Sequence, residues 1–294
     1  MTDHIEHRIT APDGRTLAAA EWGDPAGVPL IAIHGTPGGR LSRWRDASIY
    51  ARAGVRRISF DRAGYGLSTR RPGRRVADIA EDVTAIADAL GVGRFAVTGR
   101  SGGGPHTLAC AALLGDRVMR CAAVVAVAPF DADGLDWFAG QTPGNVSEGR
   151  LALEGEDALR AKLEPDRETI LDRLARGAKD ALPDDYELSE SDKIQQAKDR
   201  ALMAEVLPDA LQAGVDGWVD DDIAFVMPWG FDVSSITVPT SLWYGRADTL
   251  VPAAHGDWLA AHIPGVEVHA SGFGHFGEDA DAERELAWLA GRPG

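Results

Sequence analysis

The feature that most constrains this 294-residue chain is the segment Gly99-Arg100-Ser101-Gly102-Gly103, in which a serine lies between glycines at positions −2 and +2. It follows an apolar run that predicts a short strand at 95–98 and precedes a helical pattern at 102–114. A strand that turns directly into a helix holds its central residue in strained backbone geometry and exposes that side chain above the sheet. The pattern therefore predicts that Ser101 is a nucleophile. The alternative is a glycine-rich turn with an incidental serine.

Short apolar runs alternate with helical patterns in the first 130 residues and again after residue 228. Strands are expected at 7–10, 17–22, 29–34, 55–60, 95–98, 121–129, 240–244 and 266–270. Helices are expected at 41–53, 76–90, 102–114, 253–262 and 281–290. This alternation predicts an α/β fold with a mostly parallel central sheet and helices on both faces.

The middle segment, residues 131–228, differs from the rest of the chain. It holds 10 basic against 24 acidic residues, whereas residues 1–130 hold 17 against 12, and it contains no convincing strand. Three or four helices are expected here, one of them reaching residue 181. Breaks between them are expected at three prolines: Pro165, Pro183 and Pro208. We therefore expect residues 1–130 and 229–294 to form the core, and 131–228 an inserted all-helical cap over the carboxyl ends of the strands.

A serine nucleophile needs a base, and a histidine is the usual one. Among the eight histidines, His275 lies in a glycine-rich loop just after the last predicted strand, where its side chain can reach over the edge of the sheet. His106 follows Ser101 on the same helix and should point away from it. His255 and His262 belong to a helical pattern that we expect to be exposed. These positions predict His275 as the base.

The base in turn needs an acid that orients its far nitrogen. Asp248 follows the strand expected at 240–244, and it gives the chain order serine, aspartate, histidine. The rival position follows the preceding strand, at Asp131 or Asp133. We predict Asp248 as the acid and leave the rival position open.

The loop His34-Gly35-Thr36-Pro37-Gly38-Gly39 follows the first buried strand. The backbone N–H of Thr36, paired with that of Gly102, is predicted to form an oxyanion hole. The alternative is a tight strand–helix turn. No glycine-rich phosphate motif accompanies the loop. His34 itself is expected to be a hydrogen-bonded structural residue.

Other polar and aromatic motifs receive mostly structural interpretations. The loop at 61–66, Asp-Arg-Ala-Gly-Tyr-Gly, is predicted to hold backbone groups near the mouth of the site, and the run Asp220-Asp221-Asp222 to lie on a solvated face. Aromatic residues flank the insertion and should pack it onto the core, with some lining an apolar pocket for an acyl or alcohol group. The candidates for substrate contact are Arg100, Trp137, Phe138 and Trp229.

Composition excludes several function classes. A net charge of −15 argues against nucleic acid as a partner, because binding phosphates needs clustered cations. No apolar run approaches the roughly 20 residues of a membrane helix, and the first residues do not resemble a signal peptide, so a cytoplasmic protein is expected. Cys110 and Cys121 are expected to be buried free thiols. We expect a small-molecule substrate, and neither a metal nor an organic cofactor.

Five motifs appear in an order that resembles the α/β-hydrolase superfamily. They are His34-Gly35 with its Thr-Pro-Gly-Gly extension, the loop at 61–66, Gly99 to Gly103, Asp248 with Val251-Pro252, and Gly274-His275. The H-G-x-P-G-G loop and the cap length resemble the proline-iminopeptidase-related branch. Thr36 departs from the glycine usual in those peptidases, and Arg100 and Gly102 depart from their serine and tryptophan, which speaks against aminopeptidase activity.

The residues and the resemblance together predict a serine hydrolase that cleaves a small carboxylic ester through an acyl-enzyme. Ser101 in place of aspartate speaks against the dehalogenase and epoxide-hydrolase branches. Three alternatives stay open: an iminopeptidase-like aminopeptidase or amidase, a cofactor-free C–C hydrolase or lyase, and a low-turnover receptor for a small ligand.

Overall fold

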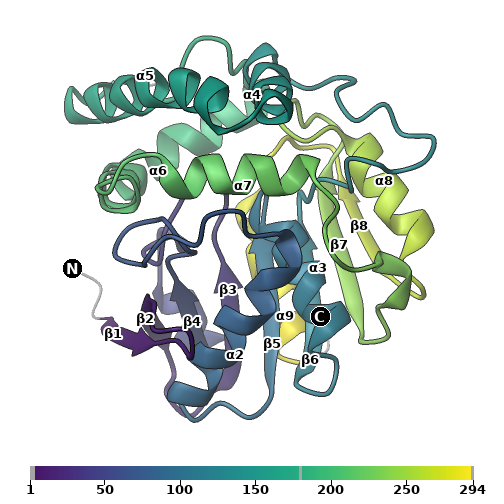
Figure 1. The fold of residues 1–294 in the computed structure, drawn as a ribbon. Coiled ribbons are helices and arrows are strands. Elements are labelled where there is room, and N and C mark those ends of the chain that lie inside the picture. Colours follow the sequence, from purple (N-terminus) through teal and green to yellow (C-terminus); the bar gives the residue numbers. More distant parts are fainter. Residues whose placement is uncertain (1–3, 179–180, 293–294) are drawn as a thin grey trace.

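The computed structural model describes residues 4–178 and 181–292 (Figure 1). Its strands form one eight-stranded sheet in the order β1-β2-β4-β3-β5-β6-β7-β8. Their bounds are β1 Ile5–Thr10, β2 Thr16–Gly23, β3 Val28–Ile33, β4 Val55–Phe60, β5 Phe95–Arg100, β6 Val118–Val124, β7 Thr240–Gly245 and β8 Glu267–Ser271. Pairing is antiparallel from β1 through β2 to β4 and parallel from β4 through β8. The predicted α/β fold with a mostly parallel sheet is confirmed.

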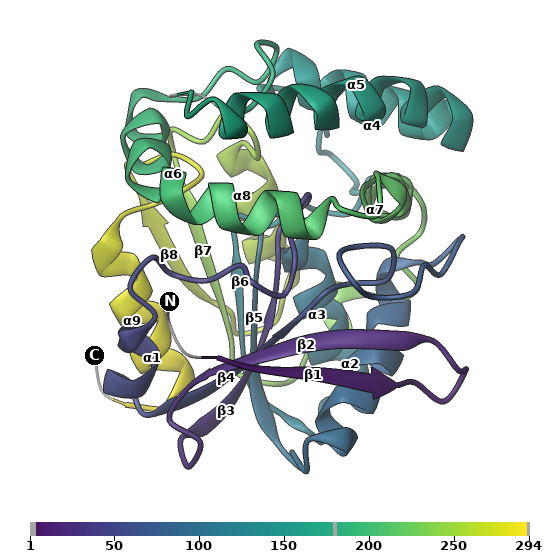
Figure 2. The ribbon, with the colours of Figure 1, turned by 90° about the vertical axis from the view of Figure 1, so that its left-hand side faces the viewer.

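Helices cover both faces of this sheet. In Figure 2, α1 (Ser48–Arg52) and α9 (Asp279–Leu289) lie on one face, and α2 (Ile79–Ala89) and α3 (Gly103–Leu113) on the other. The helix α8 (Ala253–His262) packs on β7. Because both faces are covered, the central strand β3 is apolar along its whole length rather than alternating.

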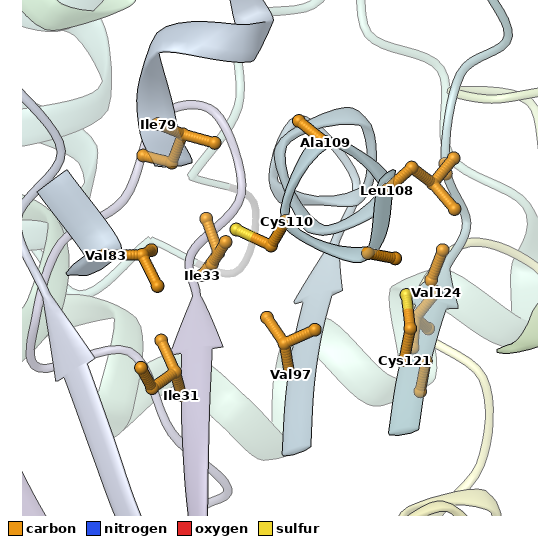
Figure 3. Close-up of a cluster of buried hydrophobic side chains, with 14 of the residues drawn as sticks. Ile31, Ile33, Ile79, Val83, Val97, Leu108, Ala109, Cys110, Cys121 and Val124 are labelled. Carbon is orange, nitrogen blue, oxygen red and sulfur yellow. The ribbon is translucent and has the colours of Figure 1, made fainter. Parts of the chain in front are cut away.

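The apolar layer between α3 and the sheet holds both cysteines. Figure 3 shows Cys110 of α3 and Cys121 of β6 among aliphatic side chains of β3, β5 and α2. Both thiols are free and buried, as predicted. Burial raises the pKa of the Cys121 thiol to about 12, and that of Cys110 is raised further. These thiols therefore act as small apolar groups in the core.

Four helices form an insertion across the carboxyl ends of the strands (Figures 1 and 2). They are α4 Pro143–Glu154, α5 Glu156–Ala175, α6 Glu190–Ala210 and α7 Asp216–Val226. A second apolar cluster joins the insertion helices to Tyr65 of the core, and on one face of α5 it contains Leu159, Leu163, Ile170 and Leu174. All four helices lie within residues 131–228, and the division of the chain into core and cap domains stays a prediction.

Two of the three predicted helix breaks are wrong. Pro165 lies inside α5 and Pro208 inside the last turn of α6, whereas Pro183 lies between these helices as expected. An interior proline costs a helix about 3 kcal/mol. In α5 this cost is offset by the four buried side chains on either side of Pro165. The helix ends at Ala175 rather than at 181, and residues 179–180 lie outside the described part of the chain.

The helix predicted at 41–53 is also too long, since only Ser48–Arg52 is helical. The preceding segment is held by other partners: Arg40 N donates to Asp61 Oδ1 at 2.6 Å, and Trp44 N donates to the Tyr50 hydroxyl at 2.9 Å. Across residues 4–178 and 181–292, none of the helices combines the length and the apolarity needed to cross a bilayer.

Candidate active site

Ser101 occupies the tight turn between β5 and α3. Its φ of +55° lies in the left-handed region that residues with a side chain rarely adopt, which is the backbone strain expected of a nucleophile turn. Both flanking glycines are required by close approach. A Cβ on Gly99 would collide with Thr107 and the Gly103 carbonyl, and a Cβ on Gly103 would lie 2.6 Å from the carbonyl oxygen of His34. The backbone therefore packs too tightly here for any larger residue.

His275 and Asp248 are brought together from two different loops. His275 Nδ1 lies 2.8 Å from Asp248 Oδ2, and the two side chains are 5% and 0% exposed. The other carboxylate oxygen, Asp248 Oδ1, accepts the N–H groups of Leu250 and Val251 at 2.8 and 2.9 Å. The carboxylate is thus fixed in orientation, and Nδ1 is the protonated nitrogen of the imidazole.

The rival acids lie elsewhere. Asp131 and Asp133 are both exposed in the loop after β6. The geometry therefore selects Asp248 as the partner of His275.

Ser101 and His275 both line a cavity of about 420 Å³ between the sheet and the insertion. The core supplies the loops at 34–37 and 99–102 and the side chains of Leu250, Val251 and Phe276. The insertion supplies a roof that is mostly apolar, from Ile170, Leu182, Leu202, Met203, Val206, Trp218 and Phe225. Such a volume suits a small organic molecule.

The predicted oxyanion loop lies directly beside the serine. A Cβ built on Gly35 would be 3.5 Å from the Ser101 Cβ, and a Cβ on Gly102 would collide with the side chain of Thr36. The two predicted donors, Thr36 and Gly102, are therefore neighbours at the edge of the cavity. Backbone N–H groups beside the serine are the donors that the predicted oxyanion hole requires.

His34 fixes the start of this loop. Its Nδ1 is 2.7 Å from Gly35 O, and its Nε2 accepts the N–H of Arg62 at 3.1 Å. Burial and the nearby Arg62 guanidinium lower its pKa well below the usual range, so the ring is neutral. This is the structural role that the sequence predicted.

Asp221 of α7 is the centre of a buried ion-pair network. Its carboxylate pairs with Arg62 and, at 2.5 Å, with Arg74, and it accepts hydrogen bonds from the hydroxyls of Tyr65 (2.8 Å) and Thr36 (2.7 Å). Despite its burial, the Arg62 and Arg74 guanidinium groups keep its pKa well below the usual range. The insertion is thereby hydrogen-bonded to the loop that is predicted to form the oxyanion hole.

The predicted solvated face at 220–222 is therefore wrong. Asp220, Asp221 and Asp222 are 4%, 0% and 8% exposed. A charged run on a helix is expected to face solvent when its partners are unknown. Here the arginines that pair with Asp220 and Asp221 come from the segment 61–74.

Two carboxyl groups of the insertion reach the same cavity. Glu148 of α4 and Asp222 of α7 both line it, and Asp222 Oδ2 has no hydrogen-bond partner within the described residues. Burial raises the pKa of Glu148 to about 8, although the Tyr186 hydroxyl donates to it. Burial and the neighbouring Glu148 raise the pKa of Asp222 as well. The cavity therefore contains two carboxyl groups that resist ionising together.

The predicted substrate contacts divide into two pairs. Arg100 and Trp137 line the cavity, but the Arg100 guanidinium donates to the carbonyl of His275 at 2.6 Å. Phe138 and Trp229 are not among the lining residues. Phe138 packs edge-on against Trp137, and Trp229 stacks on Phe231.

Sequence reasoning missed the cavity-facing carboxyls and misplaced one histidine. Glu148 and Asp222 were two among 24 acidic residues of the insertion, so no local signal distinguished them. His255, expected on an exposed face, is fully buried and accepts the N–H of Ala128 at 3.1 Å. Within the described ranges, no group of three or more His, Cys, Asp or Glu side chains is arranged to hold a metal.

Replacing Asp221 with asparagine should destabilise the protein by about 3–5 kcal/mol, because Arg62 and Arg74 would remain buried without a counter-charge. Urea unfolding followed by tryptophan fluorescence at neutral pH measures this. The control is Asp216→Asn on the same helix, because Asp216 and its partners Arg160 and Arg70 are all partly exposed, and the expected loss is about 1 kcal/mol or less. Equal losses in the two variants would contradict the central role of Asp221.

Glu148 should make the protein less stable as pH rises above neutrality. The pKa of this carboxyl is near 4.5 in the unfolded chain and about 8 in the folded protein. Between these two pH values unfolding releases a proton, so the free energy of unfolding falls as pH rises. The buried histidines, whose pKa values are lowered by burial, are neutral in the folded protein over this range. In the unfolded chain they lose their remaining protons just above the usual pKa of about 6.5, but they do so equally in wild type and variants, so a comparison of slopes removes their contribution.

In Glu148→Gln the slope of unfolding free energy against pH should therefore become flatter over this window, and the exposed Glu154→Gln on the same helix should keep the wild-type slope. Urea titrations at four pH values measure both. A wild-type slope in Glu148→Gln would show that this carboxyl ionises normally.

Several known proteins are similar in sequence to this chain. A 2-hydroxymuconate semialdehyde hydrolase of Pseudomonas putida is 27% identical over 265 residues, 88% of this chain and 84% of that protein. A proline iminopeptidase of Xanthomonas citri is 31% identical over 119 residues; the match covers 38% of this chain and only 36% of that protein's length.

Among solved structures, an esterase from Rhodococcus sp. ECU1013 superposes over all of both chains with a TM-score of 0.69 at 22% identity. An enol-lactonase from Burkholderia xenovorans LB400 covers 97% of this chain and 98% of its own, with a TM-score of 0.66 at 19% identity. The family model described as the alpha/beta hydrolase fold matches residues 28–278, and the chain belongs to this family.

Proposed function

We propose that this protein is a serine hydrolase that cleaves a small carboxylic ester through an acyl-enzyme. The observation that carries the proposal is the 2.8 Å hydrogen bond between His275 Nδ1 and Asp248 Oδ2, made at a cavity that Ser101 also lines. With Nδ1 protonated and bonded to Asp248, the lone pair of Nε2 is the one free to accept a proton. The largely apolar roof and the small volume favour a compact acyl or alcohol group.

In the proposed reaction, Nε2 of His275 takes the proton of Ser101 as Oγ attacks the ester carbonyl. The N–H groups of Thr36 and Gly102 hold the resulting oxyanion. The intermediate collapses to the acyl-enzyme, and His275 gives its proton to the leaving alkoxide. A water molecule then passes a proton to His275 and attacks the acyl group, which releases the acid and restores the Ser101 hydroxyl.

The first test is intact mass after treatment with a fluorophosphonate, combined with hydrolysis of p-nitrophenyl butyrate. Wild type should gain one adduct and turn over the ester. Ser101→Ala should gain none and lose activity on the order of 10⁶-fold, as expected when an activated nucleophile is removed. The exposed Ser235→Ala should behave as wild type. A wild type that neither labels nor turns over would contradict the proposal and favour a small-ligand receptor.

The carboxyl groups in the roof favour a second candidate, the hydrolysis of substrates that carry a free amine. Glu148 and Asp222 resist ionising together when the cavity is empty, and an ammonium group between them would let both carry charge. The unpartnered Asp222 Oδ2 is an acceptor for such a group. This candidate corresponds to the aminopeptidase alternative, and its chemistry at Ser101 would be the same.

A pair of substrates separates the two candidates: L-proline p-nitroanilide and its N-acetyl derivative. An amine-selective enzyme should prefer the free amine, and Asp222→Asn should lower kcat/KM for that substrate on the order of 10²-fold with little effect on the acetylated one. Equal rates on both substrates, unchanged in Asp222→Asn, would rule out amine recognition. A vinylogous diketone in the same panel tests C–C hydrolysis.

A further inference from the structure

The loop that carries His275 is held from above by the first turns of α6, a helix of the insertion. Gly274 N donates to Ser191 Oγ at 3.0 Å, and Phe276 N donates to Asp192 Oδ1 at 2.7 Å. The backbone immediately before and immediately after His275 is therefore fixed by two neighbouring side chains of one helix.

Further contacts complete this hold on the loop. Gln195, one turn further along α6, donates its Nε2 to Gly277 O at 3.1 Å. From the core side, Arg100 Nη1 donates to His275 O at 2.6 Å. The core thus binds the carbonyl of His275, and the insertion binds backbone groups of the residues on either side of His275.

Asp192 is itself rigidly placed. Its side chain is fully buried, and its second carboxylate oxygen, Oδ2, accepts the hydroxyl of Ser189 at 2.7 Å. Ser189 in turn caps α6 by accepting the N–H of Asp192 at 3.2 Å. A Cβ on Gly274 would collide with the Asp192 carboxylate, so the loop and the helix touch at a position where only glycine fits. Neither partner can shift without displacing the other.

We propose that Asp192 is a positioning residue for the catalytic histidine. It acts through the backbone N–H of Phe276, and it holds the His275 ring in line between Asp248 and Ser101. The inference rests on the proposed function, because His275 matters for catalysis only as the base. A hydrogen bond to a carboxylate is stronger than one between neutral groups, which suits a group that must fix a loop.

The alternative is that Asp192 only stabilises the first turn of α6. A structural residue would change the folding free energy, and its loss would leave the active site unaltered in the molecules that remain folded. A positioning residue would change kcat in the folded protein, because a misplacement of about 1 Å can cost about 10²-fold in rate.

The experiment compares Asp192→Ala, Asp192→Asn and the control Glu190→Ala, all assayed well below their melting temperatures. Glu190 is an exposed carboxylate of the same turn and pairs with Lys193. Asp192→Ala should lower kcat and the fluorophosphonate labelling rate about 10²-fold with KM little changed. Asp192→Asn keeps an oxygen acceptor for Phe276 N and should recover most of that loss, and Glu190→Ala should match wild type.

A spectroscopic readout makes the test independent of turnover. The Nδ1 proton shared by His275 and Asp248 should give a far-downfield proton NMR signal in wild type and Asp192→Asn, and it should be broadened or lost in Asp192→Ala. If Asp192→Ala does not fold, Ser191→Ala removes the acceptor of Gly274 N together with a 3.0 Å hydroxyl contact to Ser189, and it should lower kcat up to about tenfold.

The inference would be overturned if folded Asp192→Ala, which lacks the acceptor of Phe276 N, kept the kcat, the labelling rate and the downfield signal of wild type. A wild type that is not labelled, but whose downfield signal is still lost in Asp192→Ala, would overturn the proposed function and leave the positioning of His275 by Asp192 intact.

Discussion

The arrangement of the site depends on the ion pairs and hydrogen bonds that the buried Asp221 carboxylate makes. An isolated buried carboxylate is very costly, and it is tolerated here because two guanidinium groups and two hydroxyls surround it. Those partners come from two separate loops of the core, residues 61–75 and the loop that contains Thr36, whereas Asp221 belongs to the insertion. One charge therefore fixes the roof to the floor of the cavity, and it does so at Thr36, beside the predicted oxyanion hole.

The insertion also forms hydrogen bonds with the other two loops that carry the predicted catalytic groups. Next to Asp248, Asn145 of α4 donates to Leu250 O at 2.7 Å, and the Thr249 hydroxyl donates to Glu187 O at 2.7 Å. Around His275 the contacts come from α6. Each of the three loops is thus bonded to a different part of the insertion. The insertion is consequently a support for the site as well as its cover, and large movements of it would have to disturb the loops beneath.

What the sequence predicted well was locally determined. The strand–turn–helix around Ser101 needs only its own glycines, and the order of strands and helices follows from short apolar patterns. What it missed depended on distant partners. Asp221 looks like any aspartate in a run of three, and its burial is decided by Arg74, which lies 147 residues earlier in the chain. Pro165 looks like a helix break, and the helix continues because apolar side chains on both sides of it pack into the insertion. Glu148 and Asp222 belong to different helices, so their meeting at the cavity is a tertiary event.

The close fit between Gly274 and Asp192 has a consequence for how such proteins can diversify. The Asp192 carboxylate of the insertion fits against the core only because residue 274 has no side chain. The two segments therefore cannot be exchanged independently. A chimaera that received the helical segment of a relative would need the matching serine–aspartate pair as well, or its histidine loop would lose its support. Recombination between the core and the insertion is therefore constrained where Gly274 contacts Asp192. Substrate range is free to vary mainly through the side chains that face the cavity.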